Sequence, residues 1–181
     1  MKGVIFDLHE QVVVDELGEP IWAQIVAGAG GRTDHAPDGT YSHEEFLSLV
    51  RESSIALSRS PDETLIWFGR RSIALLAERY PELFRPHSST IGFVLTLNDV
   101  VHPKVSEDFP GAVVPDFEFD RVAEDTLIMA YSSYRDLCPF AQGLVEGTAD
   151  HYDEVTHMEH FHCQRKGDPR CAIVLRTSPS S

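Results

Sequence analysis

The feature that most limits the fold of this chain is a change of hydrophobic pattern at Pro110. Before this residue, apolar side chains recur at helical spacing, and after it they alternate along short segments that are rich in β-formers. Helices that come first and strands that follow predict an α+β fold, in which the strands pair with one another. We therefore expect a helical N-terminal part packed on an antiparallel sheet.

Five helices are expected before Pro110. Ser42 and Ser60 each precede a glutamate by three residues, which is the capping-box spacing, and Pro61 lies at the favoured first helical position. The last of these helices is expected to break at Pro103. The expected helices cover residues 2–17, 19–28, 43–58, 61–79 and 88–101.

Two β-hairpins are expected after Pro110, with a helix inserted between them at 139–152. The first hairpin turns across residues 123–125, and the second across 165–169, where glycine and proline favour a turn. The expected strands cover residues 116–122, 126–135, 154–164 and 170–177.

The composition narrows the class of protein. With 29 acidic and 15 basic residues among 181, the chain has a net charge of −14, which argues against binding nucleic acid, because a phosphate backbone selects for Lys and Arg. No apolar run approaches the roughly 20 residues of a membrane span. Three cysteines, an odd number, fit a reducing cytoplasm better than a secreted disulfide framework. We expect one acidic, cytoplasmic domain.

Three polar side chains recur at every second position of an expected strand: Tyr131, Ser133 and Arg135. Because side chains alternate along a strand, these three should share one face. Two hydroxyls and a planar guanidinium meet there, and the guanidinium fork suits a carboxylate or phosphate. The alternative is an exposed strand with ordinary polar alternation. We interpret the segment as a docking site for an anionic group.

His102 ends a mostly apolar helix about 30 residues upstream of this triplet. A histidine at a helix C-terminus can simply interact with the helix dipole, which is the plainer interpretation. However, an imidazole, apolar walls and a separate anion-binding patch are together what a haem requires. The imidazole ligates iron, the apolar groups hold the macrocycle, and the polar patch binds the propionates.

These features together resemble the H-NOX (haem–nitric oxide/oxygen binding) domains, a family of gas-sensing modules. The similarity runs nearly end to end, from "MKG" at the start through "NDVVH" to "GLVEG". Its most specific part is the triplet of Tyr131, Ser133 and Arg135, which binds the propionates in that family. The resemblance implies that His102 is the proximal ligand of the iron and that Pro115 presses on the haem and distorts it.

The resemblance also implies the architecture around the cofactor. Haem b would lie between a helical subdomain, about residues 1–60, and a sheet-bearing subdomain, about residues 61–178. The face of the first helix that carries Ile5 lines the distal side in the family. His9 lies one turn further along, and it either enters this pocket or is a solvated histidine beside Glu10.

Phe140 stands where oxygen-binding members carry a tyrosine, nine residues after Tyr131. A phenyl ring cannot donate a hydrogen bond to bound oxygen, whereas nitric oxide bonds strongly to ferrous iron without one. We therefore expect the protein to bind nitric oxide and carbon monoxide and to form no lasting oxygen complex.

The cysteines form a second group with nearby histidines. Cys163 and Cys171 flank the last turn, Cys138 opens the inserted helix, and His160 lies three residues before Cys163. Three Cys and one His make a closed tetrahedral zinc set, although the residues alone equally allow buried thiols or a redox disulfide. A subgroup of H-NOX proteins has a similar pattern, which favours zinc. His162 is the alternative nitrogen ligand, since it shares an expected strand face with His160.

The resemblance implies a sensor and not an enzyme. Nitric oxide binding would break the bond between iron and His102 and let the haem relax against Pro115. The sensor occupies all 181 residues, so a separate protein is expected to receive the signal. Bacterial relatives imply a histidine kinase or a cyclic-di-GMP enzyme. The alternative is a zinc or thiol redox sensor that uses the cysteine group.

Overall fold

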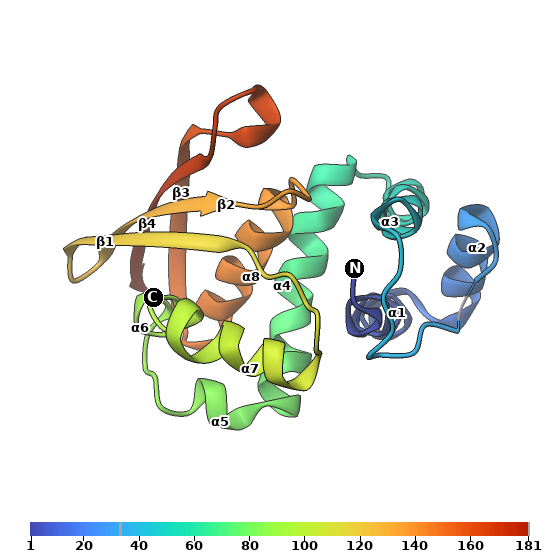
Figure 1. Cartoon of the computed structure of the whole chain (residues 1–181), viewed down its shortest axis with the longest axis horizontal. Coiled ribbons are helices and arrows are strands. Elements are labelled where there is room, and N and C mark those ends of the chain that lie inside the picture. Colours follow the sequence, from blue (N-terminus) through green and yellow to red (C-terminus); the bar gives the residue numbers. More distant parts are fainter. Residues whose placement is uncertain (33, 181) are drawn as a thin grey trace.

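Four long helices form the first part of the molecule, as the sequence predicts (Figure 1). The computed structural model describes residues 1–32 and 34–180. Ser42 accepts a hydrogen bond from the backbone of Glu45, and Ser60 forms a complete capping box with Glu63. These caps satisfy N–H groups that a helix start otherwise leaves unpaired. The four helices are α1 (Gly3–Leu17), α2 (Glu19–Ala29), α3 (His43–Leu57) and α4 (Pro61–Arg79).

The segment around Pro103 differs from the expectation. The prediction that a helix breaks there is wrong, since the chain makes a π-helical turn, η1 (Leu97–Val101), and continues as α7 (His102–Asp108) with Pro103 as its second residue. A proline in the first turn of a helix lacks only an N–H that has no partner in any case. Two shorter helices precede this segment, α5 (Pro81–Phe84) and α6 (Thr90–Val94).

The second part of the chain forms one four-stranded antiparallel sheet in the order β1-β2-β4-β3. Both predicted hairpins are present, and Gly167, at a φ of 97°, supplies the left-handed residue of the second turn. The α+β prediction is therefore confirmed. The strands are β1 (Asp116–Ala123), β2 (Thr126–Ser132), β3 (Glu154–His162) and β4 (Cys171–Pro179); α8 (Cys138–His151) and the short 3₁₀ turn η2 (Gln164–Lys166) complete the fold.

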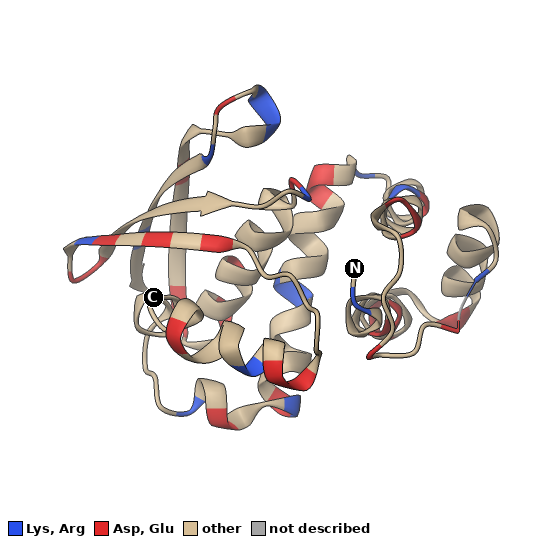
Figure 2. Ribbon diagram, in the orientation of Figure 1, with Lys and Arg blue, Asp and Glu red and all other residues tan. Residues whose placement is uncertain are grey.

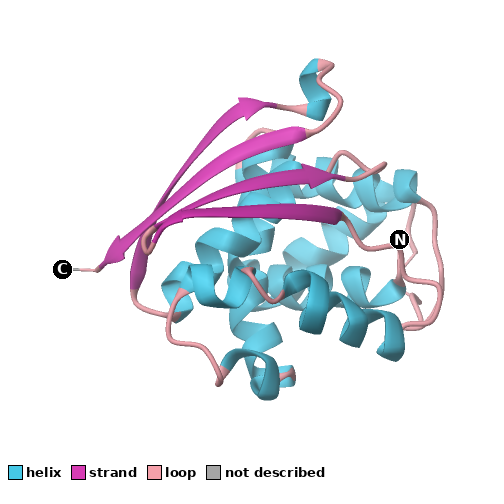
Figure 3. Ribbon diagram, turned by 60° about the vertical axis from the view of Figure 1, so that its left-hand side comes forward, coloured by secondary structure: helices cyan, strands magenta, loops and turns pink. Residues whose placement is uncertain are grey.

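The helices cover only one face of the sheet (Figure 3). Alternate residues of β2 and β4, such as Leu127 and Leu175, are buried on the covered face. On the outer face, β1 carries Asp116, Glu118 and Asp120, which are exposed and appear as acidic bands in Figure 2. Within the described parts of the chain, no helix has the length and apolar character that crossing a bilayer requires.

The helices α4 and α8 pack against each other between the sheet and the group formed by α1, α2 and α3 (Figure 1). Glycines allow this close approach: a Cβ on Gly143 would lie 2.1 Å from the carbonyl oxygen of Ile66, and one on Gly147 would lie 2.4 Å from that of Arg70. The two helices therefore meet backbone to backbone and form one wall of the cavity described next.

Candidate functional site

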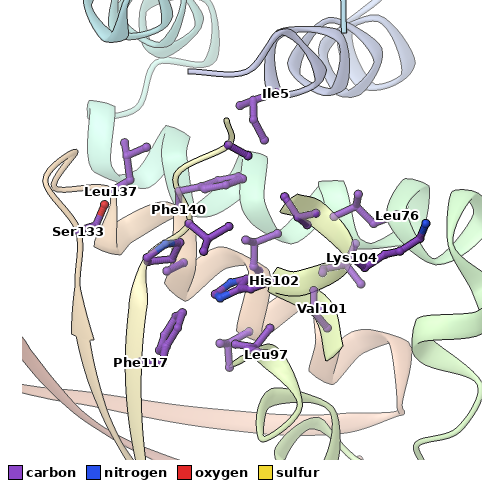
Figure 4. A pocket seen from close by; sticks show the side chains of 18 of the residues that line it. Ile5, Leu76, Leu97, Val101, His102, Lys104, Phe117, Ser133, Leu137 and Phe140 are labelled. Atoms are coloured by element: carbon purple, nitrogen blue, oxygen red, sulfur yellow. The ribbon is translucent and has the colours of Figure 1, made fainter. Parts of the chain in front are cut away.

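A cavity of about 330 Å³ lies between the helices and the covered face of the sheet. This volume is within the range of small-molecule and cofactor sites, which are mostly apolar with a few placed polar groups. The walls come from α1, α4, α8, the segment 97–117 and β2, and the apolar side chains that form them include Ile5, Leu76, Leu97, Val101, Phe117 and Phe140 (Figure 4).

His102 begins α7 and presents its ring to this cavity (Figure 4). The ring lies against that of Phe117 in β1, with centroids 5.8 Å apart and planes tilted by 32°. Burial lowers the pKa of His102 below its usual value. The side chain is therefore a neutral imidazole at neutral pH, which is the form that ligates a metal.

The triplet Tyr131, Ser133 and Arg135 lies at the cavity, although not as one strand face. The strand β2 ends at Ser132, and the chain then turns, with the backbone N–H of Arg135 donating to Ser133 Oγ at 3.3 Å. The prediction of a continuous strand to Arg135 is thus wrong, while the three side chains still converge. Burial raises the pKa of Tyr131 to about 12, so its hydroxyl keeps its proton and can donate a hydrogen bond.

Arg135 is the strongest indication of an anionic ligand. Its Nη1 donates to the carbonyl of Val113 at 2.9 Å, but its Nε is buried and has no partner among the described residues. The Met1 amino group lies close enough to be affected by this charge: its pKa is lowered first by burial and then by Arg135 and Lys2. A buried charged donor without an acceptor is costly, so the arrangement favours a carboxylate or phosphate at this position.

These residues fit a haem. The neutral imidazole of His102 faces an apolar cavity, and the unpaired Nε of Arg135 lies at another part of the same lining. The donor set matches an iron ligand and a propionate partner, which a haem presents at its centre and at its edge. Pro115 also lines the cavity, from the loop between α7 and β1.

Phe140 and Ile5 line the same cavity from α8 and α1, whereas His9 does not. Phe140 stacks on Phe68 with ring centroids 4.9 Å apart. His9 lies beyond Phe68 in the core of the N-terminal helices, where its Nε2 is 3.1 Å from Ser53 Oγ. It is 0% exposed and does not line the cavity, so both expected placements, the distal pocket and solvent beside Glu10, are wrong; burial lowers its pKa to about 4.

The three cysteines meet at the start of α8 and the turn between β3 and β4. The sulfur atoms of Cys138, Cys163 and Cys171 all lie within 4.8 Å of one another, and all three cysteines are free. Burial raises the pKa of Cys138, and the neighbouring Cys171 and Cys163 raise it further. Three thiols so close cannot all ionise without a cation, so this cysteine group can hold a soft metal ion or form a disulfide.

The structure separates the two candidate histidines of this group. His160 pairs with Ile173 on the covered face of the sheet, and its Nε2 is buried without a partner among the described residues. A bulge after His160 moves His162 into register with Ala172, where it is exposed and lies 3.4 Å from Asp168. The expectation that the two share a face is therefore wrong. Within the described chain, no histidine nitrogen lies within 4.8 Å of all three sulfur atoms.

Two contributors to these sites were not predicted. Phe117 supplies the ring against His102, and the alternation in "DFEF" could have placed it on the inner face. Gln164 accepts a hydrogen bond from the backbone of Ser133 at 3.0 Å and so ties the cysteine-bearing turn to the triplet. No local sequence signal marks this bond, because it joins residues 31 positions apart.

Comparison with known proteins finds one matching family and several solved structures of the same fold. The sequence model of a family described as Haem-NO-binding matches residues 2–160. No curated protein matches the chain.

Solved structures match over nearly the whole length. An H-NOX protein from Shewanella oneidensis in the Fe(II)NO state has a TM-score of 0.89 at 24% identity, over 98% of this chain and 99% of that chain. The Fe(II)CO form of the H-NOX domain from that organism gives 0.88 at 24% identity, with coverage of 98% and 99%. The unliganded Fe(II) H-NOX protein from K. algicida gives 0.85 at 22% identity, with coverage of 99% and 98%. At these identities the likeness shows a shared fold.

Proposed function

The chain belongs to the haem-NO-binding (H-NOX) family of haem-based gas sensors, and on this premise we propose that it is a ferrous-haem sensor of nitric oxide. The observation that carries the proposal is one apolar cavity that holds both the neutral imidazole of His102 and the unpaired Nε of Arg135. Haem, when bound, supplies a ferrous iron that can take one protein ligand and one gas molecule. The role is sensing, and no catalytic residue is proposed.

Each cavity residue has a defined task in this proposal. His102 is the proximal ligand, through the ring that faces the cavity. Arg135 binds a propionate through the Nε that has no protein partner, and Tyr131 and Ser133 add hydroxyl hydrogen bonds. Charge-assisted bonds are stronger than neutral ones, so Arg135 contributes most. Pro115, which lines the cavity, would contact a bound macrocycle and press on it.

Phe140 and Ile5 form the distal side of the proposed site. Both are apolar, and neither can donate a hydrogen bond to a bound gas molecule. His9 is separated from Phe140 by Phe68 and is bonded to Ser53. The site therefore favours nitric oxide and carbon monoxide over oxygen.

Phe140→Tyr tests this selectivity and is expected to add oxygen affinity, measured from absorption spectra in air. An oxygen complex in the unmutated protein would contradict the selectivity.

Loss of the bond between His102 and a bound haem would be the signal. The helix that carries His102 would then shift relative to the sheet in the sheet-bearing part, about residues 61–178. A separate protein reads this change, and the relatives of this family imply a histidine kinase or a cyclic-di-GMP enzyme. The proposed location of the protein is the cytoplasm, the reducing compartment that its three cysteines favour.

His102→Gly tests the haem proposal. The variant is expected to lose haem unless imidazole is supplied, because the vacated space then accepts the free ligand. The haem content of purified protein, with and without imidazole, is the measurement. Full haem retention by the variant without imidazole would refute His102 as the ligand.

The cysteine group supports a second candidate function, a zinc or thiol redox sensor. Three sulfur atoms within 4.8 Å of one another are the observation that favours it, and His160 is the better fourth ligand because its buried Nε2 is unpaired. Reduced protein is expected to contain about one zinc ion per chain, by the four-ligand rule. His160→Ala should lower this content and His162→Ala should not. Reduced protein that lacks zinc, with Cys138 and Cys163 readily joined by a disulfide, would favour the redox alternative instead.

A further inference from the structure

The helical run that carries His102 contains one turn wound more widely than an α-helix. The N–H of Val101 bonds to the carbonyl of Thr96 at 3.2 Å, and the N–H of His102 bonds to that of Leu97, so each bond spans five residues and not four. Pro103 accounts for the widening, because in a regular helix its ring would clash with the carbonyl of Asp99. Such π turns are frequent at functional sites.

One side-chain hydrogen bond fastens this turn to the sheet. Asn98 Nδ2 donates to the backbone carbonyl of Phe117 in β1 at 2.9 Å. The ring of Phe117 also packs against the ring of His102, with centroids 5.8 Å apart. A single residue of β1 thus contacts the start of the turn through its backbone and the histidine at the end of the turn through its side chain.

The other contacts of the segment are only partly buried: Leu97 and Val101 pack against the core, and residues 98–100 between them are exposed. Neither η1 nor α7 contains a buried residue, and the ion pair of Lys104 with Asp108 lies within α7 itself. Among the described residues, Asn98 makes the one side-chain hydrogen bond from η1 to β1, so the position of η1 on β1 depends on this bond together with the packing of Leu97 and Val101. Asn98 is exposed and does not line the cavity, so it is outside the proposed haem site.

We propose that Asn98 is a positioning residue for His102. Its amide holds the π turn against β1. The π turn is the hinge: its backbone changes conformation when His102 moves. The inference rests on the proposed function, since only a histidine that is released requires such a hinge. When the amide donor is removed, η1 is no longer held to the Phe117 carbonyl and His102 leaves its position more readily.

The test uses Asn98→Leu, which removes the donor at similar side-chain size, and Asp99→Leu as its matched control at the next exposed position. Both are compared with the unmutated full-length chain, reduced and loaded with haem. For Asn98→Leu, hydrogen exchange at the amides of residues 100–102 is expected to be about fivefold faster, the effect of one lost hydrogen bond. Release of the histidine after nitric oxide addition should accelerate about as much, and the iron–histidine stretching frequency should fall. Asp99→Leu should leave all three readouts unchanged.

The outcomes separate this inference from the function on which it rests. If His102→Gly loses haem but Asn98→Leu matches the control in exchange rate, release rate and stretching frequency, the role of Asn98 is overturned and the sensor proposal stands. If His102→Gly keeps its haem, the sensor proposal fails. The exchange comparison can then still be made on protein without haem, where it reports only whether Asn98 holds the turn.

Discussion

Two walls of the same cavity are built in opposite ways. On one side, α4 and α8 meet backbone to backbone, since a Cβ on Gly69 would lie 2.4 Å from the carbonyl oxygen of Phe140 and one on Gly143 only 2.1 Å from that of Ile66. On the other side, the segment formed by η1 and α7 contains no buried residue and includes a π turn. The first wall is packed too tightly to shift, whereas the second is held to the core only by partly buried residues such as Leu97 and Val101.

This difference indicates how the two walls divide the work of a sensor. A signal requires an element whose position shifts at low cost, and such elements are those with few buried contacts. It also requires a fixed element against which the shift is measured. The wall formed by η1 and α7 is the loosely held wall, and it carries His102. The wall formed by α4 and α8 is the fixed wall, and it carries Phe140.

The largest effect is expected where the fixed wall is broken. Gly143→Ala adds a methyl group against the backbone carbonyl of Ile66, which cannot move aside as a flexible side chain can. The free energy of unfolding should fall by about 3 kcal/mol, the upper end of the usual range for overpacking. Urea unfolding of the protein measures this.

The matching control lies in the loosely held wall. Val100 is 47% exposed, so Val100→Ser should change the free energy of unfolding by less than about 0.5 kcal/mol. Equal losses in the two variants would remove the distinction between the walls.

Low pH should destabilise the folded protein through His9, which is buried in the core of the N-terminal helices. Burial lowers its pKa from 6.5 to about 4, so between these values the unfolded chain binds a proton that the folded chain does not. Stability is therefore complete above pH 6.5 and is lost as the pH falls toward 4, by about 3 kcal/mol from this residue. His9→Phe should flatten that part of the pH profile in urea unfolding. An unchanged profile would mean that His9 is not buried as a neutral ring.

A smaller effect concerns how firmly the cofactor is attached beside the loosely held wall. Arg135→Ala should speed haem loss by roughly thirtyfold, equivalent to about 2 kcal/mol for a charge-assisted bond, and Ser133→Ala by roughly fivefold. Transfer of haem to an excess of apomyoglobin measures both rates. Equal rates for the two variants would argue against Arg135 as the principal propionate partner.

Much of this architecture could be predicted because it is determined locally. Ser42 and Ser60 cap their helices through residues three positions away, and the hairpins follow from alternation and turn residues. The wrong predictions concern segments whose conformation depends on contacts between residues far apart in the sequence. Pro103 does not end its helical run, because a π turn accommodates it and Asn98 fastens that turn to β1.

The candidate sites show the same limit. The group of Tyr131, Ser133 and Arg135 was recognisable from spacing, but the turn after Ser132 was not. His9 was expected either in the distal pocket or in solvent beside Glu10, yet tertiary packing buries it in the core of the N-terminal helices. A bulge of one residue, which no sequence rule located, moves His162 away from the face of His160.

The most direct test of the central claim is the absorption spectrum of the reduced protein before and after nitric oxide is added. The central claim is that His102, on the loosely held wall, is a ligand that nitric oxide releases. We expect a haem spectrum with one histidine ligand before addition, no stable oxygen complex in air, and a spectrum without the histidine ligand after nitric oxide is added. A reduced protein that keeps its histidine ligand after nitric oxide binds, or that carries no haem at all, would contradict it.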